Sequence, residues 1–192
     1  MKRLLVLFFF ILTAAVMPSC AYKLSSNSEV LPGKVQRIQI PLFKNGSSEP
    51  GVEIYFTNSL KSEALRSNVA KLVNDESSAE AILQGYIVKI EMLALDSVIE
   101  PEKDLFLAHG TVLASQYSLN VEVNLELKKK GSNIILWSGN FKQAKNLTAA
   151  QVTLPVINTS NSLYNQSAKR QTLDALSKEL MQAAFDRMLE NF

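Results

Sequence analysis

Very few side chains in this sequence have the types and spacing that chemistry requires. The 192 residues contain one cysteine, Cys20, and one histidine, His109. These two residues cannot form a Cys/His metal cluster, which takes about four ligands. A hydrolase triad that uses His109 is formally open, but no G-x-S-x-G turn displays a serine, and the phosphate-binding motifs G-x-x-x-x-G-K-[ST] and G-x-G-x-x-G do not occur. The sequence therefore predicts a protein that is not an enzyme and holds neither metal nor cofactor.

The cysteine lies where an exported lipoprotein would carry it. A short basic start is followed by a mostly apolar stretch at 4–16 and then by MPSC at 17–20. This arrangement is typical of a secretory signal at 1–19, whereas a membrane-spanning helix needs about 20 continuous apolar residues. The stretch resembles a bacterial lipobox, with Met17 in place of the usual leucine. We predict that Cys20 becomes the mature N-terminus and carries acyl chains such as palmitate, which hold a protein at a bilayer.

Charge and composition make nucleic acid an unsuitable partner. The signal contains two of the chain's 20 basic residues and none of its 18 acidic residues, so its removal leaves 18 of each sign. Nucleic-acid binding needs a clustered basic surface. The mature chain is long enough for one domain, which we place at 35–192 behind a lipidated tether at 20–34. Residue 21, directly after the cysteine, is Ala rather than Asp. By resemblance to bacterial lipoprotein sorting, this favours the outer membrane over retention at the inner membrane.

The first half of the mature chain predicts a strand, a helix and a second strand. The segment 35–43 alternates apolar and polar residues and predicts a strand that a proline ends. After a loop at 44–51, apolar residues recur every three or four positions and predict a helix that ends near Asp75. The segment 81–95 predicts a long strand whose apolar side is formed by Ile82, Tyr86, Val88, Ile90 and Met92.

The second half predicts a hairpin and a final helix. After a long loop at 96–112, the segment 115–130 alternates strictly, which predicts one buried face and one solvent-facing face that bears Glu122, Asn124 and Glu126. A turn leads into a returning strand at 134–141. A polar loop at 146–162 precedes a helix at 163–190, whose apolar stripe comprises Leu173, Leu176, Leu180, Ala184 and Met188.

These elements together predict an α+β fold. Their order is β-α-β-β-β-α, and the apolar faces of the two amphipathic helices must cover one face of the sheet. We expect a four-stranded mixed sheet with both helices packed on one face. The first two strands should be parallel because a helix links them, and the remaining strands should form an antiparallel meander.

One compact basic cluster lies at the predicted hairpin tip, formed by Lys128, Lys129 and Lys130. Lysines here could simply solvate the turn and protect strand ends from mispairing. Alternatively, their ammonium groups could meet the phosphates of an anionic lipid as mobile point charges. The loops at 96–112 and 146–162 leave a similar choice, because loops this long are uncommon without a function such as partner contact.

Several stretches resemble the LptE family of lipopolysaccharide-assembly lipoproteins. CAYKL at 20–24 is similar to the family's mature start, with Ala in place of the usual glycine. VQRIQIPLFKNGSSEPGVE at 35–53 resembles its first strand and the entry to its first helix. AEAILQGYIVKI at 79–90 is similar to its second strand, and YSLNVEVNLELKKKGSNIILWSG at 117–139 to its third and fourth. The resemblance spans nearly the whole mature chain and depends on the order and spacing of these stretches.

The resemblance implies a non-enzymatic partner protein. It would be lipid-anchored at the outer membrane, on the periplasmic side, with its domain in the lumen of an LptD-like β-barrel translocon. There it would plug the barrel, aid its assembly and contact lipopolysaccharide. No family motif aligns with the basic tip, so Lys128, Lys129 and Lys130 are proposed as lipopolysaccharide contacts on charge and exposure alone. The alternatives are a ligand-binding or structural envelope lipoprotein unrelated to lipopolysaccharide, and a hydrolase that uses His109.

Overall fold

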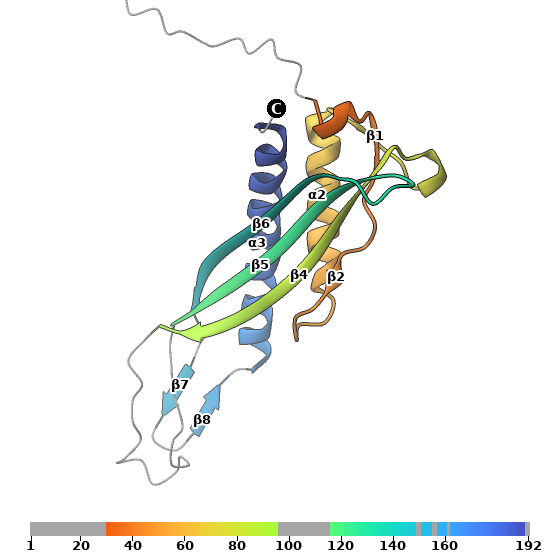
Figure 1. The fold of residues 1–192 in the computed structure, drawn as a ribbon. Helices are drawn as coiled ribbons and strands as arrows, with labels where there is room; N and C mark the ends of the chain where they lie inside the picture. The colour runs from red at the N-terminus through yellow and green to blue at the C-terminus, as the bar shows by residue number, and fades with distance from the viewer. Residues whose placement is uncertain (1–29, 96–115, 149–150, 155–156, 161, 191–192) are drawn as a thin grey trace, which may run out of the picture.

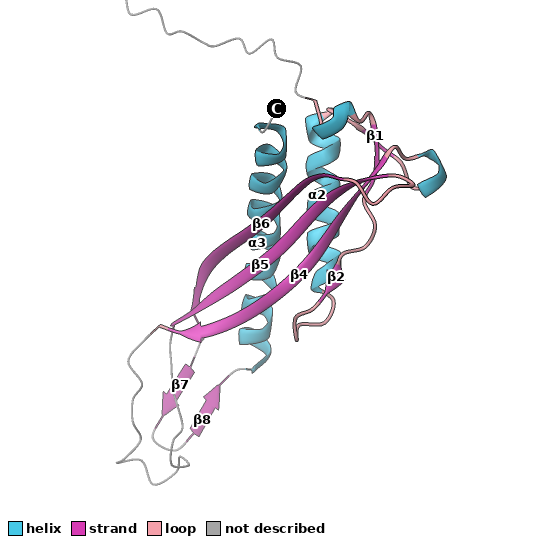
Figure 2. Ribbon diagram, in the orientation of Figure 1, coloured by secondary structure: helices cyan, strands magenta, loops and turns pink. Residues whose placement is uncertain are grey.

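A computed structural model describes residues 30–95, 116–148, 151–154, 157–160 and 162–190. Figure 1 labels the elements in space, and Figure 2 separates helices from strands. In chain order they are η1 (Pro32–Lys34), β1 (Arg37–Gln39), β2 (Lys44–Asn45), α2 (Val52–Ser67), β3 (Lys71–Leu72), η2 (Glu76–Ser78), β4 (Ala81–Ala94), β5 (Gln116–Lys129), β6 (Ile135–Thr148), β7 (Gln151–Leu154), β8 (Ile157–Ser160) and α3 (Ser162–Glu190).

Three long strands and one long helix set the dimensions of the molecule. β4, β5 and β6 have 14 residues each and pair antiparallel. At about 3.4 Å per residue, each strand extends about 48 Å. α3 has 29 residues, or about 44 Å at 1.5 Å per residue. The helix can therefore cover the strands along almost their whole length, and Figure 1 shows both helices behind the three strands.

The α+β class and the strand directions are confirmed, but the sheet is larger than the four strands expected. Its hydrogen-bonded order is β3-β1-β4-β5-β6, with β2 also paired to β4, which makes six strands. β1 pairs parallel with β3 and β4, as the helix-linked order predicts. The additional strands β2 and β3 have two residues each, which is too short for any hydrophobic period to show.

The first helix is shorter than its periodicity predicts. The prediction extended it to Asp75, but α2 ends at Ser67, and Asn68 adopts a left-handed conformation with φ 53° and ψ 21°. Asparagine tolerates this conformation better than most residues, which makes it a frequent helix stop. The chain beyond it forms β3 instead, where the apolar Leu72 pairs with Ile38 of β1.

The buried side of β4 also differs from the prediction. The register against β5 shifts between Ile87 and Lys89, so a bulge exchanges the two faces of the strand part-way along. Before the bulge, the side chains on the core face are Ala81, Leu83 and Ile87 rather than Ile82 and Tyr86. After it Ile90 is buried, as predicted, while Met92 is exposed.

The chain from 142 to 162 contains more strand than expected. β6 was predicted to end at 141 but continues to Thr148, and the expected loop at 146–162 contains the antiparallel pair β7–β8. The predicted loop at 96–112 lies entirely outside the described residues. α3 begins at Ser162, and all five residues of its predicted apolar stripe are buried.

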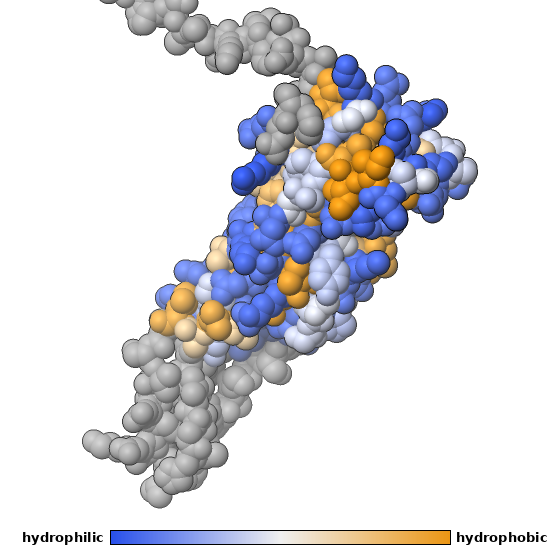
Figure 3. All heavy atoms as spheres, viewed as in Figure 1, coloured by the Kyte–Doolittle hydropathy of each residue, from blue (hydrophilic) through white to orange (hydrophobic). Residues whose placement is uncertain are grey.

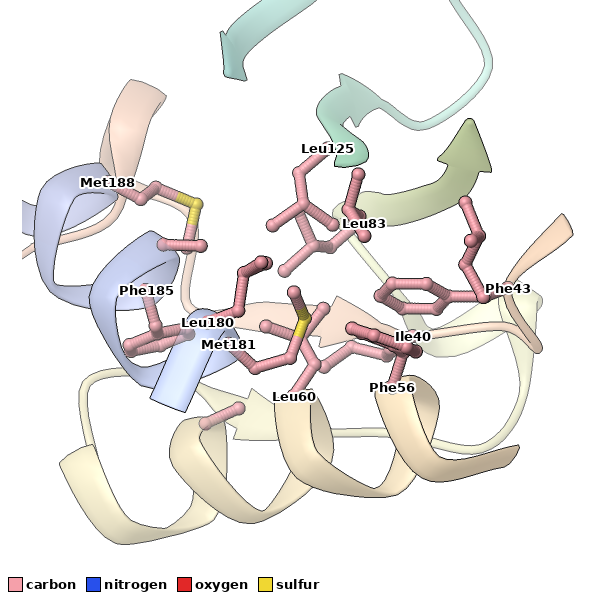
Figure 4. Close-up of a cluster of buried hydrophobic side chains, with 14 of the residues drawn as sticks. Ile40, Phe43, Phe56, Leu60, Leu83, Leu125, Leu180, Met181, Phe185 and Met188 are labelled. Carbon is pink, nitrogen blue, oxygen red and sulfur yellow. The ribbon is translucent and has the colours of Figure 1, made fainter. Parts of the chain in front are cut away.

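The core fills the layer between the sheet and the two helices. Five of the alternating apolar residues of β5 are buried as predicted, and Tyr117 at its start is half-buried. The five are Leu119, Val121, Val123, Leu125 and Leu127. Figure 4 shows side chains from helices, sheet and the β1–β2 connection meeting in one cluster, among them Phe43, Phe56, Leu60, Leu83, Leu125, Leu180 and Phe185. The rings of Phe43 and Phe56 stack at 6.3 Å. No helix within the described part of the chain is long and apolar enough to cross a membrane.

Candidate functional site: an open polar face and a basic tip

The face of β4, β5 and β6 that points away from the helices carries mainly polar side chains. Figure 3 shows this face, with hydrophilic side chains gathered over the three long strands. We call it the open face. Strand pairing brings together Gln84, Tyr86, Lys89 and Glu91 of β4, Asn120, Glu122, Asn124, Glu126 and Lys128 of β5, and Ser138, Asn140, Lys142 and Ala144 of β6. The sequence predicted this face for β5 alone.

Opposite charges alternate across the open face. Lys89 and Lys142 flank Glu122 on the neighbouring strands. The Lys142 ammonium lies 3.1 Å from a Glu122 carboxylate oxygen, and the Lys89 ammonium lies 2.6 Å from Glu91. Exposed pairs of this kind contribute little to stability because water screens them. They do leave the face nearly neutral while presenting both donors and acceptors.

Asn140 organises the centre of the face. Its amide nitrogen donates to Glu122 at 2.9 Å and to the Asn124 side-chain oxygen at 2.5 Å. The bond from Asn140, followed by the contact with Lys142, lowers the pKa of the Glu122 carboxyl below its ordinary value of 4.5. Hydrogen bonds to the charged form favour that form. Glu122 therefore stays an ionised acceptor to a more acidic pH than a free glutamate would.

A shallow hollow of about 370 Å³ lies beside these groups. Its lining includes Lys89, Glu91, Asn120, Glu122, Lys142 and Ala144. The hollow carries two basic and two acidic side chains, so it suits a polar partner that offers both kinds of hydrogen-bonding group. It contains none of the groupings of three or more Cys, His, Asp or Glu side chains that could hold a metal ion, and none occurs elsewhere among the described residues.

The structure separates the three lysines of the predicted basic cluster. The Lys128 ammonium lies 2.7 Å from Glu126 on the open face and also reaches Gln84. The Lys130 ammonium donates to the carbonyl oxygen of Ser77 in η2. Lys129 is exposed, and its ammonium makes no ion pair within the described residues. Only one of the three is therefore free to meet an anionic ligand without breaking an existing contact.

Two of the predicted functional residues, Cys20 and His109, lie outside the described residues. Sequence reasoning missed the β4 and β6 parts of the open face, including Lys89, Asn140 and Lys142. A signal for the β6 part was present, because Ser138, Asn140 and Lys142 recur at every second position, and Trp137 and Phe141 lie on the other side. The β4 part could not be found by alternation, because the bulge at 87–89 changes the face of each later residue.

The fold defines the molecule as an α+β domain that buries one face of a mixed sheet under two helices and leaves the other polar face open. Solved structures with a similar fold include uncharacterized lipoprotein B from Nitrosomonas europaea, at 19% identity over 88% of this chain and 87% of that chain, with a TM-score of 0.47. Rare lipoprotein B from Shewanella oneidensis matches at 19% identity over 79% and 91%, with a TM-score of 0.40. The PelC dodecamer from Paraburkholderia phytofirmans matches at 11% identity over 80% and 86%, with a TM-score of 0.48. No curated protein matches the sequence.

The family is identified from the sequence itself. The model of the LptE lipopolysaccharide-assembly family matches residues 35–191, which is most of the chain. The chain belongs to the LptE family, as its resemblance to that family predicted. It is therefore a member of a non-enzymatic family of envelope lipoproteins that act in lipopolysaccharide assembly.

Proposed function

We propose that this protein is exported, acylated at Cys20 and seated in the lumen of an LptD-like outer-membrane β-barrel, where it aids barrel assembly and contacts lipopolysaccharide. Family membership supports the pathway. The observation that carries the barrel contact is the open face, because three strands of 14 residues present polar side chains that no described element covers. The lumens of outer-membrane barrels are polar, so a polar surface of this size has a suitable partner there.

The proposed contact would preserve the hydrogen-bonding capacity of the open face. Its charged side chains already pair with one another, as in Glu122 with Lys142, so enclosure in a polar lumen would leave no isolated charge. An uncompensated buried charge would be strongly destabilising. The face can therefore lie against a polar wall at a small desolvation cost, whereas an apolar wall would leave its donors and acceptors without partners.

Photo-crosslinking in the native membrane tests the barrel contact. A photoreactive amino acid at Asn140 lies at the centre of the open face, and a matched probe at Ser62 lies on the exposed side of α2. We expect a detergent-stable complex with a barrel protein, and a crosslink to that barrel from the Asn140 probe. A monodisperse free lipoprotein, or a barrel complex that crosslinks only from Ser62, would contradict the proposal.

The lipopolysaccharide contact is proposed at Lys128, Lys129 and Lys130, and the structure identifies Lys129 as the residue to test first. Lys129→Glu should weaken lipopolysaccharide binding several-fold, since a lysine near an anionic lipid surface contributes about 1 kcal/mol. Lys44→Glu makes the same charge change at another exposed position and serves as the control. If binding at low salt is equal in both variants, the basic tip is not the contact, because screening could not then hide its effect.

Acylation of Cys20 is tested separately by mass spectrometry of the protein from its native membrane. We expect residue 20 at the mature N-terminus with acyl chains attached. Cys20→Ala should leave a soluble or uncleaved chain, because no acyl group would hold it at the bilayer. An unmodified thiol at position 20 in the native protein would overturn the lipoprotein proposal for this chain. His109→Ala should be tolerated, whereas the hydrolase alternative requires that this substitution abolish the function of the protein.

A further inference from the structure

One end of the domain gathers the start of the described chain and the β5–β6 turn. A Cβ atom on Gly33 of η1 would lie 3.1 Å from the Leu136 side chain at the beginning of β6. The Lys130 amide donates to the carbonyl of Glu80, directly before β4. Leu31 is almost completely buried, so the packed domain begins at this point. We call this region the tether end and define it by Val30, Lys34, Lys71, Lys129, Lys130, Ile134 and Ile135.

The tether end exposes large apolar side chains beside the turn. Ile134 is 58% exposed and Ile135 is 50% exposed, although both follow a tight turn where polar residues are usual. Val30, the first described residue, is 38% exposed. Figure 3 shows hydrophobic side chains gathered over η1 and the nearby strand ends. Exposed apolar groups collected at one place mark a contact with a protein or a membrane more often than isolated ones do.

Basic residues lie beside this apolar group and continue from it along the same end of the sheet. Lys34, Lys71 and Lys129 are exposed, and none of their ammonium groups makes an ion pair within the described chain. Arg37 is paired with Glu80 at 2.9 Å, and Lys130 contacts Ser77 beside Asp75. This end thus carries five basic residues, and the acidic residues beside them are Asp75, Glu76 and Glu80. Apolar side chains next to a row of basic residues match the chemistry of an anionic bilayer surface.

We propose that the tether end docks on the surface of an anionic phospholipid bilayer, with Ile134 and Ile135 entering the headgroup region and the lysines of this end meeting lipid phosphates. The inference depends on the proposed acylation of Cys20, because the acyl chains fix one end of the tether in that bilayer. Nine residues separate Cys20 from Val30, which limits the tether to about 35 Å. A tether this short gives an effective concentration on the order of millimolar. A contact too weak to bind a free protein is then well populated.

Hydrogen exchange on vesicles tests the docking. The test uses the chain from Cys20 onward. This chain keeps every described element, since all of them lie beyond residue 29, and it keeps the whole core that the buried residues form. Its lone thiol is coupled to a maleimide lipid in vesicles of phosphatidylethanolamine and phosphatidylglycerol, without lipopolysaccharide or barrel. We expect amides at 130–136 to exchange on the order of tenfold more slowly than in the thiol-capped chain in solution, as a docked state populated about ten to one would give. Amides at 91–95, at the far end of β4, should be unchanged.

Paired variants at the two ends of the molecule control for non-specific association of exposed apolar side chains with the vesicles. Ile134→Ser with Ile135→Ser should abolish the protection. Met92→Ser with Leu93→Ser, at two apolar positions of similar exposure at the far end, should leave it in place. Lys129→Glu changes the charge of the tether end without removing an apolar side chain, and it should also weaken the protection. Circular dichroism checks that each variant folds.

Protection at both ends alike, at neither end, or only after a barrel protein is added would overturn the docking proposal. Coupling through maleimide fixes the tether whether or not the native host acylates Cys20. Failure of the docking is therefore distinguishable from failure of the proposed function, which is measured by the mass of residue 20 and by copurification of the barrel.

Discussion

The two faces of the long β5 strand have the same backbone pairing but different side-chain environments. On the covered face, Leu119, Val123 and Leu127 are fully buried beneath the helices. On the open face, Glu122 and Glu126 alternate with them and pair with lysines near water. Burial of apolar area stabilises a fold strongly, whereas exposed ion pairs do so only weakly. The covered face therefore holds the domain together, and the open face can change without unfolding it.

One small domain can in this way be both stable and available to a partner. The helices cover one side of the sheet. No buried side-chain nitrogen or oxygen atom in the described residues lacks a hydrogen-bond partner. The other side keeps its polar groups accessible. Substitutions on the two faces should thus have separable effects, on stability for the covered face and on association for the open face.

The largest difference in the free energy of unfolding should appear between substitutions at Leu125 and at its neighbour Asn124. Leu125→Ala removes a side chain that is 1% exposed and should lower the free energy of unfolding by about 2–5 kcal/mol, because it leaves a cavity in the core. Asn124→Ala on the open face should change it by less than about 1 kcal/mol. Denaturant titration of the two variants measures both values. Equal losses would contradict the division of labour between the faces.

A somewhat smaller effect is expected where β4 must approach the core closely. A Cβ atom added at Gly85 would lie 2.3 Å from the Phe43 ring, so Gly85→Ala should cost about 1–3 kcal/mol through overpacking. The ring is held by its stack on Phe56, and the Phe43 amide donates to Thr57. Adding Phe43→Leu to Gly85→Ala should recover part of the loss. Without recovery in a double-mutant cycle, the close approach is not the cause.

A buried polar contact joins the two helices on the covered side. The hydroxyl oxygens of Ser59 and Ser177 lie 2.9 Å apart, and Ser177 donates to the carbonyl of Asp174. Since a serine has one proton to donate, Ser59 must be the donor to Ser177. Ser177→Ala should therefore cost about 1 kcal/mol by leaving a buried donor without this acceptor. Ser59→Ala should cost less, and thermal unfolding of the two variants would reveal the opposite order if the assignment is wrong.

The smallest effect belongs to the open face and depends on pH. The hydrogen bond from Asn140, followed by Lys142, lowers the pKa of Glu122 below 4.5. The stabilisation from a depressed carboxyl pKa is present above the unfolded value and is lost as pH falls through the lower folded value. Asn140→Ala should move the Glu122 pKa toward 4.5 in an NMR titration. Glu80, whose pKa is lowered chiefly by the backbone amide of Gln36, should not move.

Much of the fold could be predicted from sequence because its largest elements carry strong periodic patterns. The strict alternation at 115–130 identified β5 and its buried side correctly, and the stripe of α3 was confirmed residue by residue. Prediction failed where one residue changed the geometry. Asn68 ended α2 early although apolar residues continued at helical spacing, and the bulge after Ile87 reversed the faces of β4. Two-residue strands gave no local signal at all.

The candidate site was predicted only in part for a related reason. The sequence located the cluster Lys128, Lys129 and Lys130, but charge alone could not show that Lys128 pairs with Glu126 or that Lys130 reaches Ser77. Lys128 and Glu126 lie on the same side of one strand, where the rotamers of two side chains decide whether they meet. The contact of Lys130 with Ser77 joins residues 53 positions apart, which only the packed fold brings together. The exposed apolar residues Ile134 and Ile135 were likewise indistinguishable in sequence from buried strand residues.

The sequence by itself determined the family, the class of the fold and the polar side of β5, because a period of two or of about 3.6 residues already states which side chains can be buried together. The tertiary structure decided which residues of β4 and β6 complete the open face, which lysine is free, and that the beginning of the domain and the β5–β6 turn form one end. These properties depend on strand register, a bulge and long-range packing, and a one-residue shift in any of them exchanges the faces of a strand.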